Sequence, residues 1–336
     1  MKKHSQRYPL LVSALIMALL VPSSLFGCTL GWDYFSAHRD HNSEQADGTV
    51  TKQIKVVTSV FATYDFARQL LGEAGEVTML MDPGIEVHSF EPTVRTILTL
   101  QQAEVFVYVG GESEAWIDSL LASIDTSHMR VVRLADHVNI LDEADLEGIS
   151  NSRDAGRKDD ADFDEHIWTS PVNAKRIVQV MAQAFREYDP SRSVTITKAE
   201  EDYVDKLDAL DARFRSIVDQ AHSRVLVIGD RFPLRYFAKE YQLTCYAAFS
   251  GCSSATEASA QTIAFLINKM REESIPVVFF IELSTHRIAD TICEETGAEA
   301  LLFHSCQTVS RDDYEAGVSY LGLMGRNADN LERALR

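Results

Sequence analysis

The 336-residue chain has few basic residues and few cysteines. Its 32 Lys and Arg residues stand against 50 Asp and Glu residues, which gives a net charge of −18 at pH 7. Binding to nucleic-acid phosphates needs a basic surface, so we expect no nucleic-acid partner. The five cysteines include no CxxC pair. This absence argues against a zinc site made of thiolates.

The longest apolar run near the start, residues 10–20, follows three basic residues and is too short to span a membrane comfortably. This pattern is typical of a secretory signal peptide. The segment ends with LFGC at 25–28, which resembles the lipobox of bacterial lipoproteins, where the cysteine is lipidated and becomes the new N-terminus. We therefore expect a lipoprotein signal peptide over 1–28, with an extracytoplasmic chain anchored to the bacterial cell membrane through Cys28. An ordinary signal peptide with an incidental cysteine is the alternative.

Removal of residues 1–28 takes away three of the 32 basic residues and no acidic residue. The mature chain then has 29 basic residues against 50 acidic ones, a charge near −21. Such a surface suits work beside cations outside the cytoplasm, although solubility alone also explains it. Residues 29–52 are polar and without periodicity, which predicts a flexible linker. About 285 residues remain, enough for two domains with substantial cores.

Apolar, β-branched runs alternate with segments of helical spacing along the rest of the chain, which implies βαβ units on parallel sheets. In the first half we expect strands at 54–60, 77–81, 105–109 and 131–134 and helices at 64–71, 94–102, 116–124 and 174–188. In the second half we expect strands at 225–228, 245–248, 277–281 and 300–303 and helices at 234–240, 257–271, 287–295 and 314–335.

A long helical segment at about 195–221 separates the two halves. Its apolar residues are spaced by three and four, and it contains no Gly or Pro. We therefore predict an α/β protein of two Rossmann-like lobes, over 53–190 and 223–336, joined by one long backbone helix within 191–222. The acidic stretch 142–164 predicts a mobile loop. This loop is either a solvated segment without a specific role or a lid that attracts cations.

Polar groups follow several predicted strands, and ligands of open α/β sheets bind outside the carboxyl ends of strands. Each lobe contributes two such groups, namely His88, His166, Asp230 and His304. We expect them to meet in the cleft between the lobes. Three imidazoles and one carboxylate form a full shell for a divalent metal, and nitrogen-rich ligation suits zinc better than Mg²⁺ or Ca²⁺. Glu257 and Glu282 are reserve candidates for the metal or its surroundings.

His166 lies in the segment DEHIWTSPVNA, residues 164–174. Ser and Thr before a Pro are typical of a helix start, so His166 should lie on a short loop at the mouth of a helix. Trp168 can shield this loop from water. Asp164 or Glu165 can hold the ring nitrogen that faces away from the metal, as metal-bound histidines usually require.

Two motifs resemble the metal-specific solute-binding proteins of ABC importers for zinc and manganese. One is HSFEPT at 88–93, and the other is the segment 164–174. The resemblance covers about residues 53–336 and implies a lipid-anchored, monomeric receptor that delivers Zn²⁺, or Mn²⁺ as the second candidate, to a membrane permease. The sequence departs from the family pattern at the third and fourth ligand positions. Asp230 stands where His or Glu is usual, with one residue of uncertainty in register, and His304 stands where Asp is common.

Two other functions are compatible with these residues. An exported zinc metallohydrolase would use Glu257 or Glu282 as a general base and leave a metal position open for water, whereas a shell of four protein ligands argues against catalysis and for a protein that is not an enzyme. A metal-binding surface adhesin is also compatible. Among the four cysteines after Cys28, an even count permits disulfides in an exported protein, and we expect either a bridge between Cys252 and Cys306 or free buried thiols.

Overall fold

The computed structural model describes residues 52–143, 146–148, 163–251 and 258–336. The predicted signal peptide, the lipidation site Cys28 and most of the acidic stretch lie outside these ranges. Among the described residues, no helix is both long enough and apolar enough to cross a membrane.

Four parallel strands form the first sheet, in the order β2-β1-β3-β4. The strands are β1 Ile54–Thr58, β2 Gly75–Met79, β3 Val105–Tyr108 and β4 Arg130–Arg133. The helices that accompany them are α1 Phe61–Leu71, α2 Val94–Gln101, α3 Ala115–Leu121 and α4 Pro171–Tyr188. Four of the five residues of β1 are buried, including its three apolar residues, as expected for a strand that is paired on both sides.

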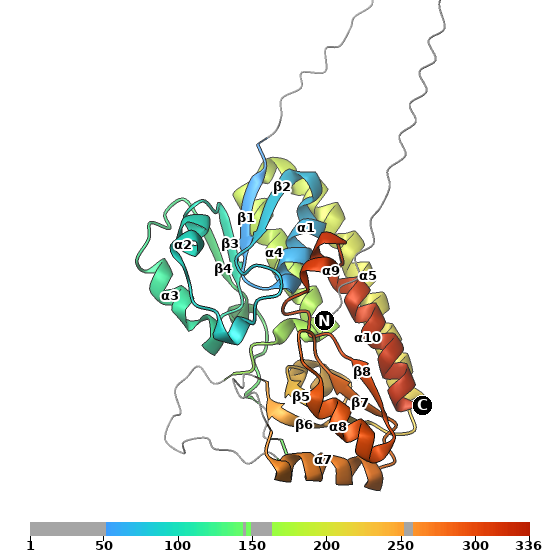
Figure 1. Ribbon diagram of the computed structural model, residues 1–336. Coiled ribbons are helices and arrows are strands. Elements are labelled where there is room, and N and C mark those ends of the chain that lie inside the picture. The colour runs from blue at the N-terminus through green and yellow to red at the C-terminus, as the bar shows by residue number, and fades with distance from the viewer. Residues whose placement is uncertain (1–51, 144–145, 149–162, 252–257) are drawn as a thin grey trace, which may run out of the picture. The chain divides into compact units, whose positions relative to one another are not determined.

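The second sheet repeats this arrangement in the order β6-β5-β7-β8, again with parallel strands. Its strands are β5 Val225–Phe232, β6 Thr244–Ser250, β7 Val277–Phe280 and β8 Glu299–Leu302. Its helices are α6 Arg235–Glu240, α7 Ala260–Glu272, α8 Arg287–Thr296, α9 Arg311–Glu315 and α10 Tyr320–Leu335. The two parallel sheets confirm the predicted fold class, and Figure 1 shows them as separate groups of strands.

A 27-residue helix, α5 Ser193–Asp219, connects the two sheets. At 1.5 Å per residue it is about 40 Å long. It packs against α1 and α4 and also against α10, and Figure 1 shows α10 running beside it. Apart from Ile196 near its start, the buried residues of α5 follow the spacing of three and four that the sequence predicted, namely Tyr203, Leu207, Leu210, Phe214 and Val218.

One prediction about the C-terminal part was wrong, because the single helix expected over 314–335 is two helices. The chain turns between α9 and α10 at Gly317, whose φ of 71° is a left-handed conformation that glycine adopts readily. The Ser319 side chain then accepts a hydrogen bond from the Gly322 N–H, which caps the start of α10.

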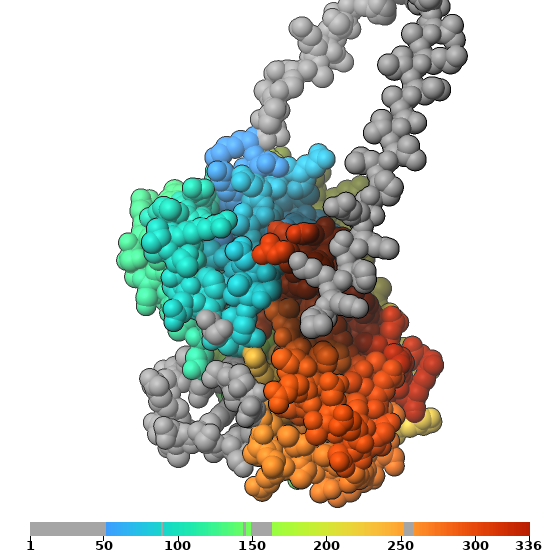
Figure 2. Space-filling model, in the orientation of Figure 1, coloured from blue at the N-terminus to red at the C-terminus, as the bar shows by residue number. Residues whose placement is uncertain are grey.

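The segment after β8 returns to the first lobe. The backbone N–H groups of Phe61 and Ala62 donate to the carbonyl oxygens of Gln307 and Cys306, at 2.9 and 3.1 Å. Tyr64 and Tyr314 are joined through their hydroxyls at 3.0 Å. Figure 2 shows the red C-terminal segment in contact with blue atoms of the first lobe.

Buried groups join the lobes as well. The Tyr320 N–H donates to the Asp65 carboxylate at 2.8 Å, and both residues are fully buried. One hydrophobic core cluster contains residues of β1, α1, α4, α5, β5, α6 and α10. The lobes therefore share a continuous core, and a movement of one against the other would have to separate packed apolar surface.

Candidate metal site

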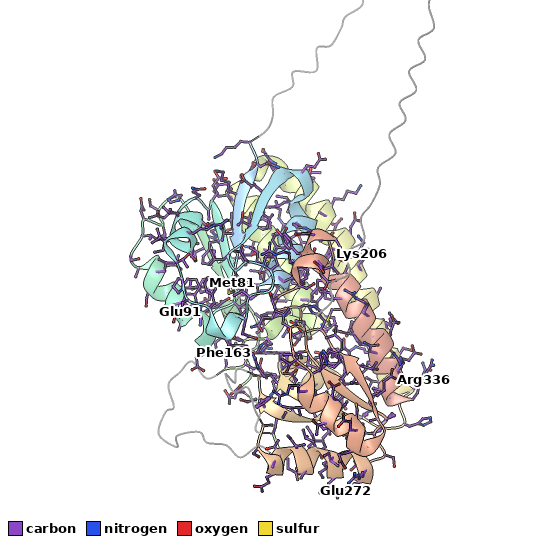
Figure 3. The ribbon with its side chains drawn as sticks, in the orientation of Figure 1. Met81, Glu91, Phe163, Lys206, Glu272 and Arg336 are labelled. Carbon is purple, nitrogen blue, oxygen red and sulfur yellow. The ribbon has the colours of Figure 1, made fainter. Side chains whose placement is uncertain are left out.

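His166 lies on the short connection that leads into α4. This connection follows Phe163, which pairs with Asp142 in an isolated antiparallel bridge and is labelled between the two sheets in Figure 3. The η5 turn Ile167–Thr169 comes next, and the Ser170 side chain caps α4 by accepting from the Asn173 N–H. The Ser-Pro helix start thus fixes the backbone next to the imidazole, as the sequence indicated.

Asp164 orients the His166 ring. One carboxylate oxygen, Asp164 Oδ1, lies 2.9 Å from the His166 backbone N and 3.0 Å from its ring Nδ1. The carboxylate therefore holds the proton on Nδ1 and leaves the Nε2 lone pair free. This Nε2 atom is buried and has no hydrogen-bond partner in the structure. A carboxylate behind Nδ1 and an unpartnered Nε2 form the arrangement that metal-binding histidines adopt.

Burial and neighbouring charges shift the pKa of His166 in opposite directions. Burial lowers the pKa of this fully buried imidazole, but the Asp164 carboxylate and the Glu165 carboxylate raise it more, so the net shift is upward. Trp168 closes the site from behind, with its ring centroid 5.7 Å from that of His166. The indole N–H donates to the Ser305 carbonyl at 2.8 Å, which ties this wall to the second lobe.

His88 comes from the short η2 turn Val87–Ser89, between β2 and α2. Its ring centroid lies 5.7 Å from that of His166, and its Nδ1 lies 3.5 Å from Glu165 Oε1. Burial is the largest influence on the pKa of His88, and the charge of His166 adds to it, so the pKa falls to about 4. His88 is therefore neutral at physiological pH, which is the form that binds metal.

Glu165 contributes an oxygen beside the two imidazoles. Its carboxylate accepts hydrogen bonds from the backbone N–H of Ser113 at 3.2 Å and from the Ser113 hydroxyl. Burial raises the pKa of Glu165. A Cβ atom at Gly111 would lie only 2.5 Å from the Glu165 carboxylate, so the absence of a side chain lets this loop pack closely against the site.

These three residues form the only group of three or more His, Cys, Asp or Glu residues with converging ligand atoms in the described part of the chain. One ligand atom from each of His88, Glu165 and His166 lies within 4.8 Å of the others. Both histidines line a small cavity of about 10 Å³, which has room for about one particle of the size of a water molecule. Two imidazole nitrogens and one carboxylate oxygen are donors that zinc accepts.

Asp230 does not join this group, and the path of β5 explains why. The pairing of β5 with β6 is irregular between Ile228 and Arg231. In the structure Asp230 lines a neighbouring cavity of about 500 Å³ between β5 and α8, and its Oδ1 accepts from the backbone N–H of Arg231. Its second oxygen, Oδ2, is buried without a partner. The adjacent Arg231 lines this larger cavity and also the small cavity with the two histidines.

His304 is buried next to this cavity but does not belong to the group of three. Its Nδ1 accepts from the Cys306 N–H at 3.0 Å, and Asn327 bonds both its backbone N–H and its carbonyl oxygen. Glu282, a reserve candidate, does line the cavity. Its carboxylate accepts from the Ser305 N–H at 2.8 Å and lies 3.6 Å from His304 Nδ1.

The other reserve candidate, Glu257, lies outside the described residues. Cys252 does so too, so the bridge between Cys252 and Cys306 stays a prediction; Cys306 is a free thiol in the structure. Cys245 and Cys293 are also free thiols.

Three residues in or beside the cavity were not predicted as ligands. The sequence offered Asp164 or Glu165 as the partner that orients His166; the structure gives that role to Asp164 and places Glu165 among the converging ligand atoms. Arg231 and Gln307 line the cavity. The uncertainty of one residue in register around Asp230 was the only signal for Arg231, and Gln307 had none.

Two lobes with parallel sheets, joined by a long helix and holding a buried pair of histidines, define the class of metal-specific solute-binding proteins. A comparison with protein families agrees. Residues 56–334 match the family model ZnuA, described as zinc-uptake complex component A, periplasmic. The chain belongs to this family, which confirms the resemblance drawn from the sequence. The family is one of transport components and not of enzymes.

Among individual relatives, the chain is 27% identical over 293 residues to the zinc-binding lipoprotein AdcA of Streptococcus pneumoniae, covering 87% of this chain but only 57% of AdcA. It is 28% identical to the high-affinity zinc uptake system protein ZnuA of Bacillus subtilis, covering 84% of this chain and 88% of that protein. The Zn(II)-bound ZnuA-like domain of S. pneumoniae AdcA has a TM-score of 0.70 and 25% identity, with 84% and 99% of the two chains covered.

Proposed function

We propose that this protein is an extracytoplasmic receptor that binds Zn²⁺ between its lobes and delivers it to an ABC permease, with Mn²⁺ as the second candidate metal. The observation that carries this proposal is the buried, unpartnered Nε2 of His166, with Asp164 behind the ring and His88 and Glu165 beside it. A buried nitrogen without a partner costs free energy, and a metal ion would satisfy it.

The donor set supports zinc over magnesium or calcium. Mg²⁺ and Ca²⁺ prefer oxygen ligands, whereas two of the three converging groups here offer nitrogen. The family description and the Zn(II)-bound AdcA structure support the same metal. Glu282 is the candidate for a fourth ligand, because it lines the same small cavity.

Delivery to a permease and anchoring through a lipid are also part of the proposed function. The family name describes a component of an uptake complex, and AdcA is named a lipoprotein. The sequence LFGC at 25–28 supports lipidation at Cys28 in this chain. A monomer that is held at the membrane can receive metal outside the cell and pass it to a membrane partner.

Calorimetric titration of the purified metal-free protein tests the metal site. We expect one zinc per chain and tighter binding of zinc than of manganese in competition. His166→Ala should weaken zinc binding by at least about a hundredfold, since it removes a metal-bound nitrogen. His286→Ala is the matched control, because this exposed histidine pairs with Asp290 away from the cavity. Equal losses in the two variants would refute the assignment.

A further inference from the structure

Arg231 brings a permanent positive charge to the metal cavity. It lies in β5 just after the irregular pairing with β6, and its side chain lines the cavity together with His88 and His166. Only 19% of the side chain is exposed. A guanidinium has hydrogen-bond donors only and stays protonated in proteins, so Arg231 cannot serve as a metal ligand.

Arg231 lies close enough to the site to act on a bound cation, because it lines the same small cavity as the two imidazoles. The guanidinium would repel a dication in this cavity twice as strongly as a single positive charge, because Coulomb energy scales with the product of the charges. The interaction takes place in a mostly buried space, where salt and water screen it only in part.

Glu86 counters this charge. Its carboxylate oxygen Oε1 lies 2.9 Å from Arg231 Nη1, and the same oxygen lies 3.4 Å from the backbone N of His88. Glu86 is thus a bridge between the guanidinium and the turn that presents His88. The carboxylate is 41% exposed, so the ion pair lies at the solvent side of the cavity.

We propose that Arg231 sets the metal affinity of this receptor: its guanidinium opposes the bound dication, and Glu86 restrains it by neutralising its charge at the cavity edge. This inference rests on the proposed function, since it assumes that metal binds at His88, Glu165 and His166. The consequence is a site that holds metal less tightly than its buried donors would allow, which favours release to the next protein.

Three variants test the inference by zinc titration. Arg231→Gln removes the charge and should tighten zinc binding by at least about tenfold. Glu86→Gln frees the guanidinium and should weaken binding. In the double variant the effect of Glu86→Gln should shrink, because the charge that Glu86 neutralises is then gone. Arg235→Gln is the matched control, since Arg235 lies four residues away and donates to the backbone carbonyl of Asp142.

Ionic strength separates an electrostatic role from a structural one. The difference between wild type and Arg231→Gln should narrow as salt rises, because salt screens the repulsion between guanidinium and metal. If Arg231→Gln fails to fold, Glu86→Gln and its salt dependence still decide the question.

The outcomes separate a failure of this role of Arg231 from a failure of the proposed function. Suppose that wild type binds zinc, His166→Ala does not, and Arg231→Gln binds no more tightly than wild type. The inference is then overturned while the proposed function stands. Weaker binding by Arg231→Gln would overturn it too, and would indicate that the guanidinium holds an anion that helps to bind the metal. If neither wild type nor Arg231→Gln binds zinc, the proposed function fails and this inference fails with it.

Discussion

Replacing Asp164 by asparagine keeps the shape of the side chain but removes the charge that orients His166. The amide oxygen of the new side chain could still accept from the His166 backbone N–H and ring Nδ1, which now lie 2.9 and 3.0 Å from Asp164 Oδ1. The imidazole would lose its charged partner and become a weaker donor to metal. Loss of such a partner typically weakens metal binding about 10- to 100-fold, or about 1.4 to 2.7 kcal/mol.

The same variant should change how the stability of the metal-free protein depends on pH. Asp164 is among the groups that raise the pKa of His166 in the folded state. A raised pKa contributes stability that is fully present below the unfolded value of about 6.5 and is lost as pH rises through the folded pKa. The stability difference between wild type and Asp164→Asn should therefore shift in favour of wild type at about pH 5.5 relative to about pH 8.5.

Calorimetry and thermal unfolding at two pH values provide the assay. Asp142→Asn is the matched control, because Asp142 is exposed and its bridge to Phe163 is made by the backbone. An unchanged zinc affinity in Asp164→Asn would refute the reasoning about His166 orientation. An equal loss in Asp142→Asn would show that the effect is one of general charge.

Three further predictions follow from the site, the anchor and the shared core. His88 is neutral down to about pH 4, whereas the pKa of His166 is raised, so zinc affinity between about pH 8 and 6 should fall by at most about tenfold per pH unit. Zinc titrations at several pH values measure this dependence, and a steeper fall that corresponds to the displacement of two protons per zinc would contradict the prediction. Cys28→Ser should abolish lipidation and shift the protein out of the detergent phase; unchanged partitioning would reject the anchor. Because the lobes share one core and α5 has no Gly or Pro, small-angle scattering curves with and without zinc should nearly overlay, and a lobe rotation of tens of degrees would refute this.

The fold was largely predictable, because its strands and helices show strong local periodicity. Each predicted strand has a counterpart, and α5 lies within two residues of its expected bounds. The break between α9 and α10 depends on a left-handed Gly317, and an isolated glycine in a helical pattern does not reveal its φ.

The site was predictable where local motifs determine it and not where distant segments do. His88 and His166 come from short, distinctive motifs and lie together in the structure. The choice between Asp230 and Arg231 depends on the irregular pairing of β5, and a shift of one residue in a strand exchanges its faces. His304 is held by Asn327, 23 residues further along the chain, and no local pattern encodes that contact.

Anomalous diffraction at the zinc absorption edge, from crystals of the zinc-loaded protein, tests the central claim most directly. We expect one strong peak within about 2.0 to 2.2 Å of His166 Nε2, a ring nitrogen of His88 and a Glu165 oxygen. A peak beside Asp230 in the neighbouring cavity, or no peak near His166, would contradict the account.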